Sequence, residues 1–325
     1  MKLLKLVPDN TNIKFLKLRL PFFVLSLVLI FGSWAAVLVN GLNFGVDFAG
    51  GQEVRMTFEN QEAAPIPSLR ELVSGLGYGD PVVQEFGAPN QVSVRVALPE
   101  GAEDTPGAAT AIGAKVIAAI AKEYPDARTD GNDTVSGKVA GEFRNQALLA
   151  LLAAMAAVSV YIWVRFEWQF GVGAMFALVH DVSVTLGLFA LTQMEFSLQI
   201  VAAILAIIGY SLNDTIVVYD RIRENLKKFR KMPLPELLDL SVNETLARTV
   251  MTSLTLFIAL IPLLIFGPPS LFGMVAAITV GLFIGTYSSI YMAGPLLIWM
   301  GVTSDSFVPQ ESKVDRQEKI ARGEA

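Results

Sequence analysis

Six stretches of the sequence are long enough and apolar enough to cross a lipid bilayer. The hydrocarbon core of a membrane is about 30 Å thick, and an α-helix spans it with about 20 apolar residues. The chain of 325 residues is 53% hydrophobic and 17% charged, whereas soluble domains carry about 25% charged residues. The sequence therefore predicts an α-helical membrane protein with six transmembrane helices, at residues 20–39, 147–164, 170–191, 198–219, 249–266 and 271–300.

Lysine and arginine are distributed unevenly among the segments outside these runs. Residues 1–19 and 220–248 are rich in both, whereas two other short connections contain neither. Because basic residues mark the cytoplasmic side of a membrane protein, we expect both of these segments and the polar tail 301–325 to be cytoplasmic. The run at 20–39 is longer than the apolar core of a signal peptide, which has about 7 to 15 residues. This length favours an uncleaved first span over the alternative of a cleaved signal.

The polar region between the first two spans, residues 40–145, reads as a small α+β domain on the extracytoplasmic side. Val92, Val94 and Val96 alternate with polar residues, which is typical of a half-buried strand. The pattern predicts strands and helices in the order β-α-β-β-α-β, at residues 52–58, 68–76, 81–86, 91–98, 106–123 and 130–138. This order is that of the ferredoxin-like fold, which hosts too many functions to indicate one.

The rarest residue types exclude several classes of function. The chain has no cysteine and one histidine, His180, so disulfides, thiolate metal sites and multi-histidine metal centres are excluded. It also lacks a glycine-rich phosphate loop followed by Lys and Ser or Thr, which argues against a nucleotide-driven enzyme. A net charge of −5 spread over both signs does not indicate a nucleic-acid partner. We therefore expect a chain that is not an enzyme and that holds no metal or organic cofactor.

One carboxylate lies inside the fourth apolar run. Asp214, directly after Asn213, is about 8 Å from the midpoint of residues 198–219, well within the hydrocarbon. A charged residue near the centre of a membrane helix costs about 2.5 to 3.5 kcal/mol, and such residues usually pair with one another or carry protons. Two interpretations follow: a structural carboxylate held by Asn213, Tyr210 and a neighbouring helix, or a protonatable relay.

The third span carries a second acidic residue. Asp181 follows Gly173 and Ala177 at every fourth position, on a face of small residues that another helix can approach closely. His180 is its neighbour in the sequence but lies on a different side of the helix. Asp181 and His180 are second-rank relay candidates, and hydrogen-bonded packing residues are the alternative.

The sixth span contains a ladder of small residues and a proline. Small side chains at every fourth position allow two helix backbones to pack closely, either within this chain or against a partner. Pro295 predicts a kink or an end in the same span. The helix-packing seam comprises Gly273, Ala277, Gly281 and Gly285.

Three motifs resemble the signatures of a known family. FGVDFAGG at residues 44–51, GYSLNDTIVVYDRIREN at 209–225 and SVNETLARTVMTS at 241–253 resemble those of the SecD and SecF protein-export subunits. The motif at 209–225 is of the SecF type, and the resemblance covers essentially the whole chain. This family is similar to one half of a resistance-nodulation-division (RND) transporter, so it implies half of an RND-type bundle.

The first of these motifs also has a structural interpretation. Gly45, Gly50 and Gly51 are expected to supply backbone angles that other residues rarely adopt, where the first span joins the domain. Asp47 is expected to accept hydrogen bonds from backbone N–H groups in that turn.

The resemblance implies a subunit of the bacterial inner membrane with both termini in the cytoplasm. With SecD it would use the proton-motive force to promote late steps of the passage of an unfolded preprotein through the SecYEG translocon, with YajC as a further candidate partner and membrane lipids around the spans. The family's proton-pathway residues, an Asp in the fourth span and an Arg at the start of the fifth, match Asp214 and Arg248, and Asn213 adjoins the former. Sodium ions are the alternative coupling ion, and Arg248 has the alternative interpretation of an interface anchor.

Two other functions stay open at this point. A non-catalytic scaffold of the translocon would need the fold but not the titration of Asp214. A half-transporter exporting a lipid or small molecule would need a substrate cavity between spans and would work in membranes without a translocon.

Overall fold

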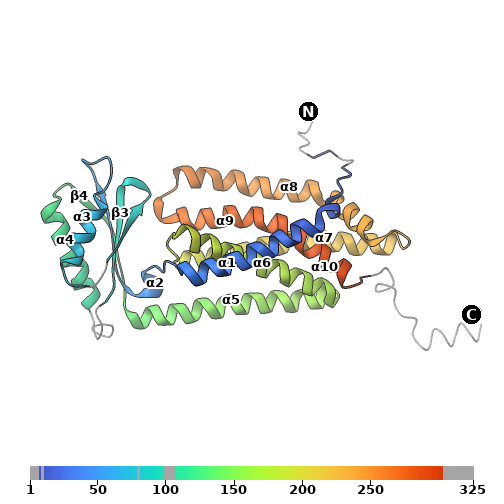
Figure 1. Cartoon of the computed structure of the whole chain (residues 1–325), viewed down its shortest axis with the longest axis horizontal. Coiled ribbons are helices and arrows are strands. Elements are labelled where there is room, and N and C mark those ends of the chain that lie inside the picture. The colour runs from blue at the N-terminus through green and yellow to red at the C-terminus, as the bar shows by residue number, and fades with distance from the viewer. Residues whose placement is uncertain (1–6, 9–10, 79–80, 99–106, 303–325) are drawn as a thin grey trace, which may run out of the picture.

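Membrane helices form the long body of the molecule, and a small sheet domain lies beyond one of its ends (Figure 1). The structure is a computed structural model that describes residues 7–8, 11–78, 81–98 and 107–302. Within these residues six helical segments are long and apolar enough to span a membrane, which confirms the predicted helical membrane protein with six spans. The spans are η1 (Phe15–Leu18) with α1 (Arg19–Asn40), α5 (Gly137–Arg165), α6 (Trp168–Thr192), α7 (Leu198–Lys228), α8 (Leu234–Phe266), and α9 (Pro269–Ser288) with η2 (Ser289–Ala293) and α10 (Gly294–Trp299).

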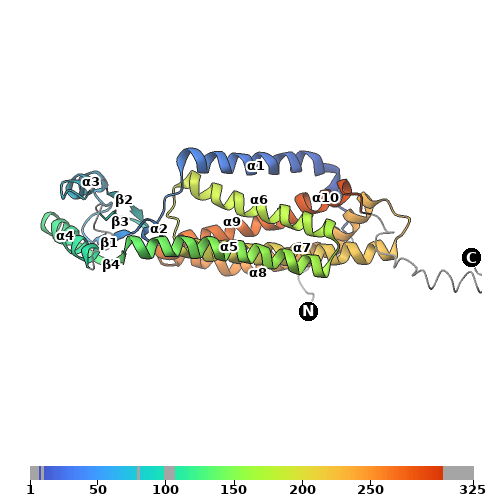
Figure 2. The ribbon, with the colours of Figure 1, turned by 90° about the horizontal axis from the view of Figure 1, so that it is seen from below.

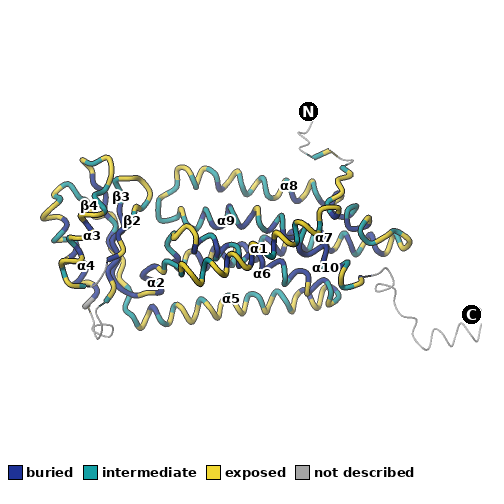
Figure 3. Tube along the Cα trace, in the orientation of Figure 1, coloured by how far each residue is buried: buried dark blue, intermediate teal, exposed yellow. Residues whose placement is uncertain are grey.

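Helices α6 and α7 form the centre of the bundle. More than half of the apolar stretch of each is buried, whereas α5 and α8 are mostly exposed along theirs. The exposed α5 runs along one side of the bundle (Figures 2 and 3). Helix α1 packs closely on α6 because Gly187 has no side chain, and a β-carbon there would overlap Ser33. Several polar residues of α6 and α7, among them Asp181 and Asp214, are therefore buried inside the bundle.

Helices α7 and α8 extend well beyond the predicted spans. α7 continues to Lys228 and α8 begins at Leu234, so the basic connection expected at 220–248 is two helix ends joined by a short turn. Charged side chains pair along these ends, as in the 2.6 Å contact between Arg221 Nη1 and Glu224 Oε2. Such i,i+3 pairs stabilise exposed helix. Hydropathy detects only the apolar part of a helix, which is why the prediction stopped short.

The last span changes its helical geometry before Pro295. After α9 the chain forms the π-helix η2 and then the short helix α10, in which Pro295 lies in the first turn. Proline lacks an N–H and its ring displaces the carbonyl four residues earlier, and a wider π-turn accommodates both effects. The change also places two consecutive hydroxyl groups, those of Ser288 and Ser289, in the buried interior of the bundle.

The sheet domain, residues 51–135, contains four strands in the order β2-β3-β1-β4, with antiparallel neighbours. Its core includes Val54, Leu69 and Val116, which are fully buried where α3 and α4 cover one face of the sheet. The order of elements along the chain is the expected one, although the expected start of the second helix at residue 106 lies outside the described residues. The elements are β1 (Gly51–Phe58), α3 (Ile66–Ser74), β2 (Val82–Phe86), β3 (Ala88–Val96), α4 (Ala108–Glu123) and β4 (Ala127–Val135).

The second face of β3 is also buried, which differs from the half-buried strand expected at residues 91–98. Ser93 and Arg95 on β3 are 0% and 6% exposed. They lie opposite Arg55 and Glu53 of β1. This polar face is turned toward the ends of α7 and α9 rather than toward solvent, because the domain docks on the bundle.

A tight turn containing the short helix α2 (Val46–Ala49) connects α1 to the sheet domain. Gly50 and Gly51 have φ angles of 72° and 121°, which side chains disfavour, and a β-carbon on Gly51 would overlap a backbone carbonyl of β3. Gly45 differs from the expectation, because its φ of −68° is ordinary. It is needed for space instead, since a β-carbon there would overlap the carboxylate of Glu195.

Candidate functional site

Asp214 lies on the buried side of α7, about 24 Å from the first residue of the helix at 1.5 Å per residue, and is 7% exposed. Thr249 Oγ1 on α8 donates a hydrogen bond to Asp214 Oδ1 at 2.6 Å, and Ser289 Oγ on η2 donates to Oδ2 at 2.8 Å. No ion pair found among the described residues includes this carboxylate. Asp214 is therefore a buried acid supported by hydroxyl groups from two other helical segments.

Asp181 forms a second buried carboxylate centre on α6. Ser288 Oγ donates to its Oδ2 at 2.9 Å, and Ser211 Oγ on α7 donates to the same oxygen. His180 Nδ1 is 2.9 Å from Asp181 Oδ1, so the two side chains meet although the sequence placed them on different sides of the helix. His180 Nε2 is buried and, within the described part of the chain, has no hydrogen-bond partner.

The two centres share their supporting elements. Ser211 and Asp214 lie on the same side of α7, three residues apart. Ser288 and Ser289 are consecutive, and each bonds a different carboxylate. A change in backbone geometry at the start of η2 therefore affects both hydrogen bonds.

The structure does not bring Arg248 to Asp214, although both match proton-pathway residues of the resembled family. Arg248 is exposed, and it lines a cavity of about 610 Å³ together with Asp220 and other charged residues at the basic end of α7. One residue corresponds to a rotation of about 100° around a helix, so Thr249 and not Arg248 faces Asp214. Asn213 is exposed as well, for the same reason.

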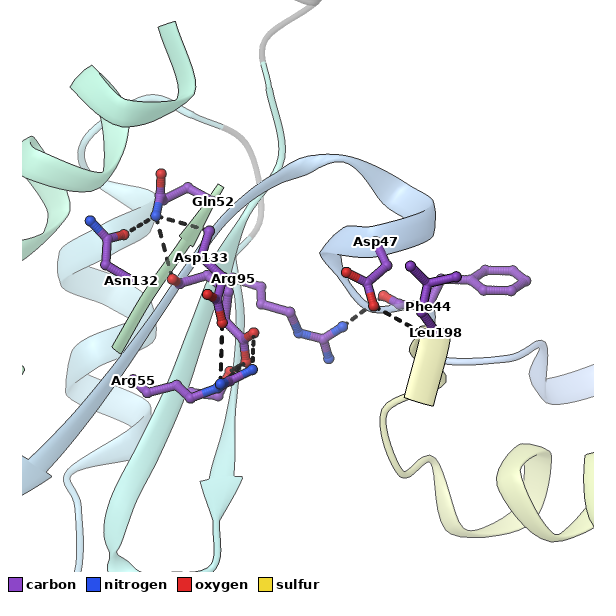
Figure 4. A network of polar contacts seen from close by, with 10 residues as sticks. Phe44, Asp47, Gln52, Arg55, Arg95, Asn132, Asp133 and Leu198 are labelled. Atoms are coloured by element: carbon purple, nitrogen blue, oxygen red, sulfur yellow. Dashed lines mark hydrogen bonds and ion pairs between the residues drawn. The ribbon is translucent and has the colours of Figure 1, made fainter. Parts of the chain in front are cut away.

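The turn at residues 44–51 contacts both the start of α7 and the sheet domain (Figure 4). Asp47 Oδ2 accepts a hydrogen bond from the backbone N–H of Leu198 at 2.9 Å. Arg95 Nη1 donates to the carbonyl of Phe44 at 2.7 Å. The N-cap residue of α7 makes no capping bond with its side chain, so Asp47 supplies the acceptor from a distant part of the chain. The turn at residues 44–51 is thus the docking point of the domain.

The ladder of small residues in the last span packs on α7 of the same chain. Gly281 approaches Ile207, whose Cδ1 would be 2.5 Å from a β-carbon at residue 281. Gly285 approaches Ser211 in the same way, and Ala277 is fully buried. Gly273, nearer the sheet domain, has a looser contact with α7.

Sequence reasoning missed the hydroxyl residues that contact the two acids. Their signal was weak, because serine and threonine are common at helix interfaces in membranes, and only the relative rotation of the helices selects those that face a carboxylate. The residues are Ser211, Thr249, Ser288 and Ser289.

Two family descriptions match the chain. "Protein export membrane protein SecD/SecF, C-terminal" matches residues 115–303, more than half of the sequence, and "SecD/SecF GG Motif" matches residues 35–62. The first match contains both buried carboxylates, and the second contains the docking turn.

Curated relatives and solved structures agree with this match. "Protein translocase subunit SecF" of Cereibacter sphaeroides is 45% identical over 303 residues, covering 92% of this chain and 93% of its own. That of Pseudomonas aeruginosa is 39% identical, covering 93% and 96%. The crystal structure of SecDF, a translocon-associated membrane protein from Thermus thermophilus, superposes with a TM-score of 0.81 at 32% identity. It covers 90% of this chain, which spans 39% of that longer chain.

Proposed function

The chain belongs to the SecD/SecF family of protein-export membrane proteins, as a translocase subunit of the SecF type, and we propose that it couples a proton gradient to polypeptide export. In this proposal it acts with SecD in the bacterial inner membrane, with both termini in the cytoplasm. Protons crossing the membrane then promote late steps of the movement of an unfolded preprotein through the SecYEG translocon. YajC is a further proposed partner, and membrane lipids surround the six spans.

The observation that carries the proposal is that, among the described residues, only hydroxyl groups bond the Asp214 carboxylate. A carboxylate buried without a cation costs several kcal/mol in a low-dielectric interior, and binding a proton removes that charge. Thr249 and Ser289 can accept or donate hydrogen bonds, so both the charged and the neutral carboxyl keep their partners. The site is therefore suited to take up and release a proton without leaving a polar group unpaired.

Asp181 and His180 are proposed as a second station of the same relay. Nε2 of His180, which has no hydrogen-bond partner in the described part of the chain, offers a buried nitrogen that can hold a proton. Ser211 and Ser288 connect Asp181 to the helices that also support Asp214. A proton at one centre alters the hydrogen bonds that position the other.

The exposed side of α7 and α8 is the proposed contact with SecD. Asn213 and Arg248 lie on long apolar helices yet face outward, and polar residues within a membrane are rarely left against lipid. Asn213 is one helical turn from Val217, which lines the same cavity as Arg248. In this proposal the charge of Arg248 acts on the relay at the interface with SecD. It does not act on Asp214 within this chain.

Each proton that crosses 100 mV delivers about 2.3 kcal/mol. This energy can bias a two-state packing of α7 but is far too small to move a whole polypeptide in one step. The proposed motor therefore works through repeated cycles, and the sheet domain is its proposed moving part.

The test is gradient-driven export in sealed vesicles that contain this chain, SecD and the translocon. Asp214→Asn is expected to abolish the stimulation of export by the proton gradient while the complex still assembles. Glu142→Gln is the matched control, because it removes an exposed carboxylate of another membrane helix, α5, that does not line the cavity of Arg248. Full gradient-stimulated export by Asp214→Asn would refute the relay and favour a scaffold.

Sodium ions are tested in the same vesicles. A sodium gradient imposed without a proton gradient is expected to give no stimulation. Stimulation of export by a sodium gradient alone would identify sodium, and not the proton, as the coupling ion.

A further inference from the structure

A cavity of about 590 Å³ separates the polar face of the sheet domain from the ends of α7 and α9. The sheet contributes Glu53, Arg55 and Asp133 to its lining, and α7 and α9 contribute, among the described residues, only uncharged ones. Glu195, in the connection between α6 and α7, also lines the cavity. The cavity is thus a charged space at the junction that holds the domain on the bundle.

The carboxylate of Glu195 lies in this junction and has no hydrogen-bond or ion-pair partner among the described residues. Its carboxylate packs against Gly45, where only a glycine leaves room for it. Within the described residues Glu195 makes no hydrogen bond or ion pair, although its neighbours Gly45 and Phe196 are joined by a backbone hydrogen bond of 3.0 Å. The proposed relay in the bundle does not use this carboxylate.

The charges that face Glu195 come from two strands of the sheet domain and from α2 in the docking turn. Glu53 and Arg55 lie on β1, Arg95 lies on β3, and Asp47 lies on α2. Both arginines already have partners. Arg55 pairs with Glu53 at 2.7 Å, and Arg95 donates to the backbone carbonyl of Phe44 and to Oδ1 of Asn43. Neither arginine is within ion-pair distance of Glu195.

We propose that Glu195 binds a proton when the sheet domain docks on the membrane helices, so that docking responds to the acidity of the compartment on that side. When the domain is docked, Glu195 is half-buried at the cavity, near the carboxylates of Glu53 and Asp47. When the domain separates, Glu195 becomes solvated and its proton leaves to water. This inference deepens the proposed function, because an acidic exterior would then fasten the domain before a proton reaches Asp214.

The electrostatics of the junction support this assignment. Burial, with repulsion from Glu53 and Asp47, raises the pKa of Glu195 from 4.5 to about 7, against the opposing effect of Arg95 and Arg55. The docked state therefore holds the proton more tightly than the separated state does. Docking is strongest below pH 4.5, weakens as the pH rises toward 7, and changes no further above it. Within that window each pH unit changes the ratio of docked to separated domains by up to about tenfold.

The test measures the position of the domain directly. Because the chain has no cysteine, Ser74→Cys on α3 and Phe266→Cys at the end of α8 provide two unique sites for spin labels. Both positions are exposed. The distance distribution between the labels is measured by pulsed electron paramagnetic resonance on the full chain in lipid nanodiscs, at pH 5 and pH 8. No ion gradient is imposed and no preprotein is exported in this measurement.

We expect a single narrow distribution at pH 5 and a broader or displaced one at pH 8. Glu195→Gln, which cannot ionise, is expected to give the narrow distribution at both values, and Glu195→Asp is expected to keep the pH dependence. Glu85→Gln is the matched control, since it removes an exposed carboxylate that lines the same cavity, and it should behave as the unsubstituted chain does.

A distribution in the unsubstituted chain that is the same at both pH values would overturn the proposal. So would a Glu195→Gln chain that still responds to pH or that is broad at both values. Asp214→Asn is expected to leave this response unchanged, so a failure of the relay and a failure of the junction are distinguishable.

Discussion

Replacing Asp47 with alanine should loosen the start of α7. Asp47 supplies the only side-chain acceptor found, among the described residues, for the N–H of Leu198, at 2.9 Å. A hydrogen bond to a charged group contributes about 1.5 to 3 kcal/mol, and a carboxylate at a helix N-terminus gains a further few tenths from the helix dipole. We therefore expect Asp47→Ala to weaken this helix start by about 2 kcal/mol, which corresponds to about 30-fold in an equilibrium constant.

Hydrogen exchange measures this change. Protection of the Leu198 amide, read by mass spectrometry on the chain in nanodiscs, should fall by about the same 30-fold factor if exchange occurs through local opening. Asp47→Asn keeps a side-chain oxygen in place, so it should lose only the part of this stabilisation that depends on the charge of the carboxylate. Amides near Lys228, at the other end of α7, serve as the internal control. Unchanged protection of Leu198 in Asp47→Ala would show that the distant cap does not hold the helix.

Other substitutions test the packing of the bundle and its surface. Gly281→Val should lower the thermal unfolding temperature through overpacking against Ile207, at a cost of about 1 to 3 kcal/mol, whereas Gly294→Ala, with no atom near its new methyl group, should be neutral or slightly stabilising. Equal unfolding temperatures for the two variants would contradict the close approach of α9 to α7. Arg165→Ala breaks a 2.8 Å pair with Asp220, and because both side chains are substantially exposed it should change stability by less than about 1 kcal/mol in denaturant unfolding; a larger loss would indicate a further role for the arginine.

The spans could be predicted from sequence because each is an apolar run of membrane length, and burial in lipid depends on composition alone. The ends of α7 and α8 could not, since their charged extensions are stabilised by pairs such as Arg221 with Glu224 and not by hydrophobicity. The buried polar face of β3 was missed for a related reason. Alternation identified which residues share a face of the strand, but it could not reveal that the domain docks with its polar face toward the bundle.

The candidate site shows a similar division. Asp214 could be singled out because a carboxylate inside an apolar run has few explanations. Its partners could not be identified, because the choice between Arg248 and Thr249 depends on a rotation of α8 by a single residue. The packing of the helices fixes that rotation, and packing depends on contacts between residues far apart in the sequence.

The length of α7 has a mechanical consequence. Its 31 residues form a rod of about 46 Å, longer than the roughly 30 Å hydrocarbon core, with Asp214 close to its midpoint. If the rod pivoted there by about 10°, its two ends would move about 4 Å in opposite directions. A small change in packing around one carboxyl group would then reach both water-facing surfaces at once, beside the sheet domain at one end and at the basic turn at the other.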